Sequence, residues 1–146
     1  MGGMMIPHLR HEYFHPMPIF SNHKNTWHLI ADMPRMETRH ATNFKIIIDW
    51  NDQGHGLEEG KFKVALMRGP MHEVAEWVYH PAPHHRRKME LLGHASTHGM
   101  FFRPGVMRKG DHFRLSYHVG GGLFAHSLEI HHFNFTYWSE GNGGLF

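Results

Sequence analysis

Short segments in which apolar and polar residues alternate recur along the chain from residue 26 onward. Asn43–Trp50 carries an apolar side chain at every second position, and His112–Val119 alternates in the same way. A period of two residues is typical of a strand with one buried face. The pattern predicts about eight strands, at Thr26–Ala31, Asn43–Trp50, Lys61–Arg68, Val74–His80, Lys88–Gly93, Met100–Arg103 with a continuation past Pro104-Gly105 to Arg108, His112–Val119 and Leu123–Trp138.

Turn-forming residues separate these segments. Asn51-Asp52-Gln53-Gly54 and Gly120-Gly121-Gly122 are two such groups, and Lys109-Gly110-Asp111 predicts a hairpin turn between short strands. Only one helical turn is expected, around Met71–Ala75. Many short strands with turns at intervals of roughly 8–12 residues favour an all-β domain. We therefore predict a single antiparallel β-sandwich over residues 26–138, either immunoglobulin-like or jelly-roll-like.

The two ends of the chain differ from this middle part. Residues 1–25 show no clean period and contain three prolines, yet they hold six large apolar or aromatic residues: Ile6, Leu9, Tyr13, Phe14, Ile19 and Phe20. This composition predicts an extended arm that packs onto its own domain or onto a neighbouring subunit. Residues 139–146 form a glycine-rich tail, which we expect partner subunits to hold.

The stretch from Phe124 to Trp138 changes its alternation partway. Its apolar positions first follow Phe124, Leu128 and Ile130, and then the opposite parity of Phe133, Phe135 and Tyr137. A strand that keeps one face buried can change parity only through an extra residue or a crossing between sheets. We predict this irregularity at His131-His132, with one of the two histidines unpaired.

Histidine dominates the titratable residues. The chain has 18 histidines and a formal net charge of +2 with all of them neutral. No two histidines lie two residues apart, the spacing at which neighbouring strand side chains chelate one ion most easily. Histidines from different strands can still converge, so metal binding stays an alternative, with copper, zinc or nickel as the ion. Its candidate ligands are His94, His98, His126, His131 and His132.

The absence of cysteine narrows the chemistry. It excludes a disulfide scaffold, a cysteine nucleophile, a thiolate zinc site and a blue-copper centre. The chain also contains no glycine-rich phosphate loop and no nucleophile elbow. Two groups could supply acid–base chemistry: His72, Glu73 and Glu76 in one segment, and Asp49, Asp52, His55 and Glu58 around one turn. We interpret both as surface and turn residues, and predict neither catalysis nor a cofactor.

A basic stretch runs from His80 to Lys88. Prolines 81 and 83 extend its backbone, and its candidate binding residues are His84, His85, Arg86, Arg87 and Lys88. Such a loop suits an anionic surface, either nucleic acid, lipid head groups or an acidic protein. The alternative is a solvated connection between strands.

These observations favour a non-catalytic structural subunit that packs through its arm and tail in a larger protein assembly. The alternative is a histidine-based metal carrier or sensor. The first residues lack the charge pattern of a signal peptide, and no apolar run reaches the roughly 18 residues of a spanning helix. There are too few acidic residues to pair most histidines, so we expect the melting temperature to fall between about pH 7 and 5.

Overall fold

The structure is a computed structural model that describes residues 8–22, 26–37, 40–54, 59–120 and 126–140. Within these ranges the chain forms nine strands and one short helix, which run in the order β1 (His8–Phe14), β2 (Ile19–Ser21), β3 (Trp27–Asp32), β4 (Ala41–Asp52), β5 (Lys61–Arg68), β6 (His72–Tyr79), β7 (Arg87–His94), α1 (Gly99–Phe102), β8 (His112–His118) and β9 (Leu128–Glu140). No helix in the described ranges is long and apolar enough to cross a membrane.

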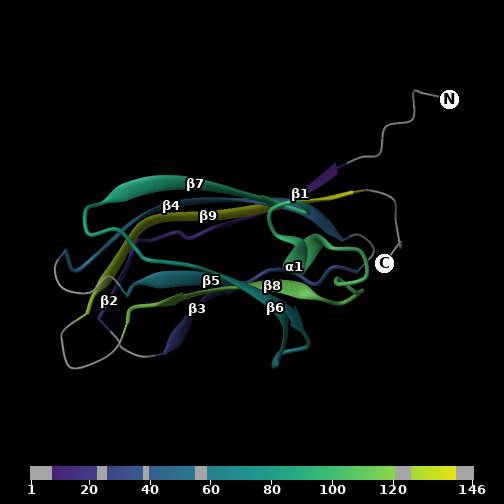
Figure 1. The fold of residues 1–146 in the computed structure, drawn as a ribbon, viewed down its shortest axis with the longest axis horizontal. Helices are drawn as coiled ribbons and strands as arrows, with labels where there is room; N and C mark the ends of the chain where they lie inside the picture. The colour runs from purple at the N-terminus through teal and green to yellow at the C-terminus, as the bar shows by residue number, and fades with distance from the viewer. Residues whose placement is uncertain (1–7, 23–25, 38–39, 55–58, 121–125, 141–146) are drawn as a thin grey trace.

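The strands form two antiparallel sheets that lie face to face (Figure 1). Sheet A has the order β1-β9-β4-β7, with β2 also paired to β9. Sheet B has the order β3-β8-β5-β6. The chain alternates between the sheets except at the β1–β2 and β5–β6 steps, and its first strand pairs with its last, which is the strand order of a jelly roll. The predicted antiparallel sandwich is confirmed.

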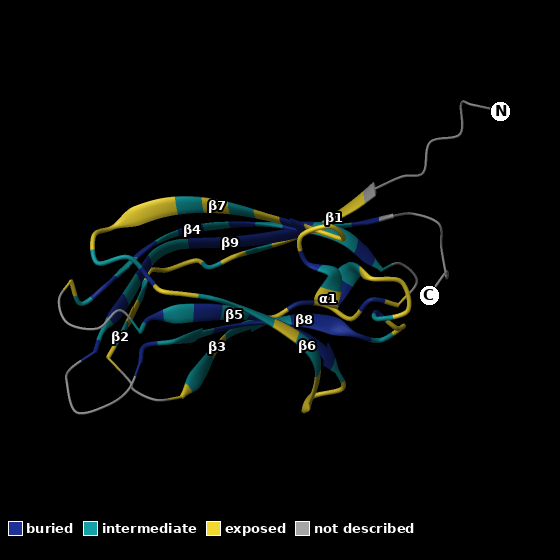
Figure 2. Ribbon diagram, viewed as in Figure 1, coloured by how far each residue is buried: buried dark blue, intermediate teal, exposed yellow. Residues whose placement is uncertain are grey.

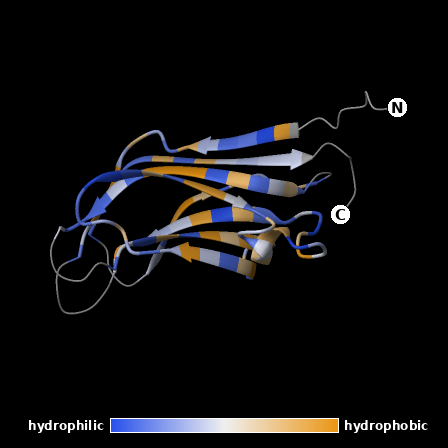
Figure 3. Cartoon of the chain, turned by 45° about the horizontal axis from the view of Figure 1, so that its top comes forward, coloured by the Kyte–Doolittle hydropathy of each residue, from blue (hydrophilic) through white to orange (hydrophobic). Residues whose placement is uncertain are grey.

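The core lies between the sheets and follows the alternation of the sequence. In β4, the four apolar side chains at every second position have 0% exposure, while the residues between them are partly exposed. In β8, Phe113 and Leu115 are buried in the same way. Figure 2 shows that buried residues concentrate in the central strands of both layers, and Figure 3 shows apolar and polar residues alternating along the strands. Burial of alternate side chains is therefore what selects these segments as strands.

The N-terminal segment adds strands to sheet A. Residues His8–Phe14 pair with the second half of β9, and Ile19–Ser21 pair with its first half. Pro16 and Pro18 lie between these two strands, where no ladder hydrogen bond is required of them. Residues 1–7 of the expected arm and 141–146 of the expected tail lie outside the described residues, whereas Ser139 and Glu140 belong to β9.

Three local predictions between residues 71 and 111 are wrong. The segment expected as a strand from Met100 to Arg108 instead begins with helix α1, whose Arg103 N–H donates to the Gly99 carbonyl. Phe101 of this helix is fully buried at one end of the sandwich, and an apolar run this short does not distinguish helix from strand. Because no strand precedes it, the turn at Gly110 does not close a hairpin. The helical turn expected around Met71–Ala75 is the beginning of β6, because pairing with β5 satisfies its backbone.

The predicted irregularity in β9 is confirmed. Trp50 of β4 pairs with Ile130 and Asp49 pairs with His132, so His131 has no partner of its own in this ladder. Ile130 and Phe133 both face the core with 1% exposure. The strand begins at Leu128, later than expected, and the predicted residues 123–125 lie outside the described ranges.

Candidate functional site

The bulge in β9 places two adjacent histidines on the outer face of sheet A. In a regular strand His131 and His132 would point to opposite faces, and one of them would enter the core. The extra residue instead leaves both between the core-facing Ile130 and Phe133. Bulges often re-aim side chains in this way next to functional sites.

His131 is held by a strand neighbour. Its Nε2 atom lies 2.7 Å from Oδ1 of Asn51 and 3.5 Å from a carboxylate oxygen of Glu129. The Asn51 amide also donates to the Glu129 carboxylate at 3.4 Å. These contacts fix the imidazole on the outer face, so that it cannot swing freely into solvent.

His132 lies beside an ion pair that connects sheet A to the basic stretch. Asp49 stands opposite His132 in the ladder, and its carboxylate receives three guanidinium contacts from Arg86 at 2.8–3.1 Å. These Arg86 hydrogen bonds, assisted by the charges of Arg86, His131 and His132, lower the pKa of Asp49 despite its partial burial. Asp49 is thus ionised at neutral pH and holds the Arg86 guanidinium against sheet A.

Aromatic side chains from the N-terminal strands cover these histidines. The ring of Phe14 meets His132 edge-on at 5.0 Å between centroids, and Phe20 meets His131 in the same manner at 6.0 Å. Both phenylalanines remain largely in solvent, with 53% and 65% exposure, and Met17 between them reaches 71%. The six residues Phe14, Met17, Phe20, Arg86, His131 and His132 are here named the bulge surface.

A shallow pocket of about 340 Å³ borders the bulge surface. Phe20, Leu128 and Glu129 contribute to its lining. The pocket combines one exposed ring, one apolar side chain and one carboxylate, so it offers a place for an apolar group next to hydrogen-bond acceptors. It suits a side chain of a partner better than a free small molecule, because it does not enclose its contents.

The remaining residues of the basic stretch differ in their availability. His84 bonds through Nδ1 to the buried carboxylate of Asp52 at 2.7 Å, and the Gly54 N–H donates to the same oxygen. His85, Arg87 and Lys88 are exposed. The turn carboxylates Asp49 and Asp52 therefore pair with Arg86 and His84, which reduces the net positive charge of the stretch. His55 and Glu58 of that turn lie outside the described residues.

The other histidines proposed as metal ligands occupy separate environments. His94 is exposed and bonds to Ser96, whereas His98 is buried against Phe44 and Trp77. His126 has 5% exposure, and its Nε2 atom lies 3.5 Å from the Glu59 carboxylate. Over the described ranges, no three histidine or acidic side chains are grouped so that they could hold a metal ion. Metal binding remains a prediction from composition.

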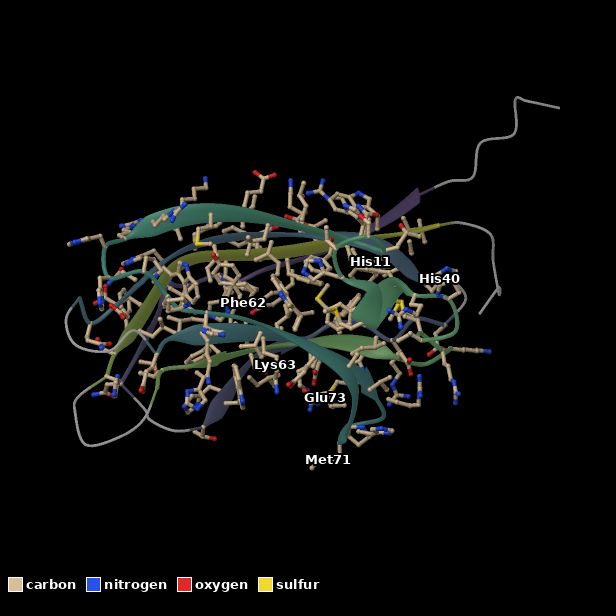
Figure 4. All side chains as sticks on the ribbon, viewed as in Figure 1. His11, His40, Phe62, Lys63, Met71 and Glu73 are labelled. Carbon is tan, nitrogen blue, oxygen red and sulfur yellow. The ribbon has the colours of Figure 1, made fainter. Side chains whose placement is uncertain are left out.

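The acid–base group in β6 is assembled by a second bulge. Leu66 pairs with Ala75 and Met67 pairs with Glu73, so Val74 is the extra residue. Glu73 and Glu76 consequently lie on the same outer face of sheet B, and both contact the Lys63 ammonium, at 3.0 and 3.6 Å. Figure 4 labels Lys63 and Glu73, two members of this group. A hydrogen bond that the protonated Glu76 carboxyl donates to the Glu73 carboxylate, together with partial burial, raises the pKa of Glu76. The two carboxyl groups lie on an open face of sheet B. His72 is exposed beside them.

Sequence reasoning found the histidines and the arginine of the bulge surface but not their association. Asp49 stands opposite the bulge only because β4 pairs with β9, so no signal in the sequence indicated its association with Arg86. From the sequence, Phe14 and Phe20 were placed in an apolar arm, and Met17 was not singled out. Their position beside His131 and His132 depends on the pairing of β1 and β2 with β9, which alternation within one segment does not encode.

Comparisons with known proteins add one structural similarity. No family model matches the chain, and no curated protein matches it. The fold is similar to part of a solved family two carbohydrate esterase from Cellvibrio japonicus, with a TM-score of 0.33 and 10% sequence identity. The match covers 95% of this chain and 36% of the esterase chain, so this chain spans about a third of that enzyme's length. A similarity of this size carries no conclusion about activity.

Proposed function

We propose that this protein is a non-catalytic β-sandwich subunit that docks onto a protein partner through the bulge surface. The observation that carries the proposal is that Phe14 and Phe20, each more than half exposed, contact the two bulge histidines, with the exposed Met17 in the link between their strands. Exposed apolar side chains that cluster and are bordered by polar residues are typical of interaction sites. Isolated exposed apolar residues need no such explanation.

The composition of the bulge surface supports a protein partner. Aromatic residues, methionine and arginine are enriched where proteins bury surface against each other, and aromatic anchors often contribute most to affinity. Arg86 is already neutralised by Asp49, so the surface does not need an anionic ligand to balance it. We therefore expect a partner that is apolar at its centre and offers hydrogen-bond acceptors to His131 and His132.

Of the arm and tail predicted from the sequence, only the arm contributes residues to the proposed docking surface. The described part of the arm contributes through β1, β2 and the link between them, which supply all three exposed apolar residues of the bulge surface. Residues 141–146 of the tail lie outside the described residues, and the proposal does not depend on them. An anionic surface remains a second kind of partner for His85, Arg87 and Lys88.

A serine triple variant tests the proposal. We expect Phe14→Ser, Met17→Ser and Phe20→Ser together to abolish a stoichiometric complex that the unchanged chain forms when isolated from its native source. The measurement is size-exclusion chromatography with light scattering, with the partner identified by mass spectrometry. The matched control carries Leu29→Ser, Met71→Ser and Leu92→Ser, because these residues are similarly exposed but lie on β3, the β5–β6 turn and β7.

The two triple variants give distinct outcomes. Loss of the complex in the first variant and retention in the control supports docking through the bulge surface. Equal retention in both, or the absence of any stoichiometric complex with the unchanged chain, overturns the proposal. Thermal melts of both variants confirm that exposed-residue changes leave the fold intact, since such substitutions usually change stability by less than about 0.5 kcal/mol.

A further inference from the structure

Strand β1 forms an outer edge of sheet A. In the described ranges it pairs with β9 and with no other strand. About half of the backbone N–H and C=O groups of such an edge strand point away from the sheet and can accept another strand. The opposite edge of sheet A is protected differently, because β7 carries the exposed charges of Arg87, Lys88 and Glu90.

The two faces of β1 are defined by its register with β9. Arg10 and Glu12 stand opposite Trp138 and Thr136 on the outer face, where their side chains form an ion pair at 2.6 Å. His11 lies on the core side, where its ring stacks on Tyr137 with centroids 4.6 Å apart. Side chains that stand directly opposite each other in a sheet must share a face, which limits the registers open to an added strand.

The sequence of β1 is complementary to itself in one of these registers. When two copies run antiparallel with His11 opposite His11, Arg10 of each copy stands opposite Glu12 of the other. Leu9 then stands opposite Tyr13, which places two apolar side chains together on the core side. A shift by two residues in either direction places Arg10 opposite Arg10 or Glu12 opposite Glu12, which is unfavourable.

The residues that follow β1 limit the pairing to this strand. His15 donates its N–H to the Phe133 carbonyl, and Pro16 and Pro18 come directly afterwards. Proline has no N–H to donate, so a ladder cannot continue through this link. The segment available for pairing therefore ends near Phe14, and the described strand His8–Phe14 has its centre at His11.

We propose that β1 pairs with β1 of a second copy of this chain, antiparallel and centred on His11, so that two copies of sheet A become one continuous sheet. This inference rests on the proposed function for the role of the N-terminal strands in assembly, and names a second copy as the partner of β1. The contact is isologous and closes as a two-fold dimer. Because two seven-residue strands bury less than a standard interface, we expect a dissociation constant on the order of micromolar.

Charge reversal with mixing tests the register. Arg10→Glu alone places glutamate opposite Glu12 of the second copy, and Glu12→Arg alone places arginine opposite Arg10. Each variant by itself is expected to dimerise at least about tenfold more weakly than the unchanged chain, because two favourable cross-strand pairs become repulsive. Mixed together, the two variants regain opposite charges at both positions and are expected to form a heterodimer.

Sedimentation equilibrium over a concentration series measures each state, and a mass tag on one variant identifies the heterodimer. Lys88→Glu on β7 is the control and should dimerise like the unchanged chain. A monomeric unchanged chain, or single variants that dimerise as tightly as it does, overturns the inference. If a single variant fails to fold, amide hydrogen exchange of β1 in the unchanged chain decides, because pairing should slow that exchange as concentration rises.

The two proposals fail separately. The serine triple variant removes the apolar side chains of the bulge surface but leaves Arg10 and Glu12 in place. Loss of the heterodimer with an intact partner complex removes only the β1 inference. If the serine triple variant still forms the partner complex while the heterodimer is also observed, only the docking proposal is removed.

Discussion

The imidazole of His98 meets the indole of Trp77 edge-on, with ring centroids 4.4 Å apart and ring planes at 90°. Phe44 contacts the same imidazole from another side at 5.0 Å, and the Nδ1 atom bonds to the Thr97 hydroxyl at 2.8 Å. Burial first, and the neighbouring charge of His94 second, lower the pKa of His98. The folded protein therefore holds this histidine in its neutral form at neutral pH.

Acid should destabilise the protein through this group. A histidine whose folded pKa lies below its unfolded value of about 6.5 contributes stability that is complete above that value and is lost as pH falls through it toward the folded pKa. His118 acts in the same direction, because burial and then the charges of Lys61 and His28 lower its pKa. We expect the melting temperature to fall between about pH 7 and 5.

Thermal melts at fixed ionic strength measure this effect. Each 1 kcal/mol lost lowers the melting temperature of a domain of this size by roughly 2–4 °C. His98→Phe keeps an aromatic ring in the site without a titrating group, so its melting temperature should fall less over the same interval. An identical pH dependence in the variant, or a rising profile toward pH 5 in the unchanged chain, contradicts the prediction.

Gly93→Ala should destabilise the sandwich by about 1–3 kcal/mol. A Cβ atom at this position would overlap the ring of Phe44, which has 0% exposure and packs against Phe135. Gly99→Ala is the matched control, because its Cβ would meet its nearest neighbour, Arg103, at an ordinary 3.7 Å. Urea titration of both variants measures the difference, and a Gly93→Ala variant as stable as the control would falsify the packing argument.

Deletion of His131 should be tolerated, whereas deletion of Thr136 should not. Without His131, Ile130 is followed directly by His132, just as their partners Trp50 and Asp49 are adjacent in β4. The ladder then becomes regular, and each remaining side chain of β9 keeps its face. We expect a cost of about 1–2 kcal/mol, since one hydrogen bond to Asn51 is lost and the β1–β2 link must adjust.

The contrast with Thr136 follows from the alternation of side chains between the two faces of β9. Its deletion reverses the face of Tyr137, which is 1% exposed, and exposure of one large aromatic core residue costs more than about 3 kcal/mol. Denaturant unfolding of the two deletions compares them directly. Equal destabilisation by both would show that the ladder does not tolerate loss of the bulge residue.

Glu73→Gln should return the pKa of Glu76 toward its ordinary range. The hydrogen bond that protonated Glu76 donates to the Glu73 carboxylate is the largest cause of the raised pKa, and the Glu73 charge adds to it. Because the folded pKa of Glu76 is raised, its contribution to stability is present at low pH and is lost as pH rises through that pKa. Carboxyl NMR titration of Glu76 measures the shift, and an unchanged titration in the variant contradicts a hydrogen bond from Glu76 to Glu73.

Local sequence patterns predicted most strands and the bulge, but few of the contacts on the surface. Alternation in Asn43–Trp50 identified a strand whose apolar residues at every second position have 0% exposure, and the parity change in the last strand located an extra residue within one position. The same reasoning misassigned Met100–Phe102, because three consecutive apolar residues suit one buried helical turn as well as a strand. It also gave Arg86 no partner, because Asp49 lies in a different strand.

The sequence by itself determined that alternate side chains must be buried between two layers and that β9 must change its buried face at His131-His132. Both follow from the fixed period of the strand, which is a local property of the backbone. The tertiary structure decided that β1 and β2 border β9 and that Arg86 reaches Asp49. It also decided that Phe14 and Phe20 cover the two bulge histidines. These contacts depend on which strands become neighbours, and strand order is set by packing across the whole sandwich, so no single segment of the chain encodes it.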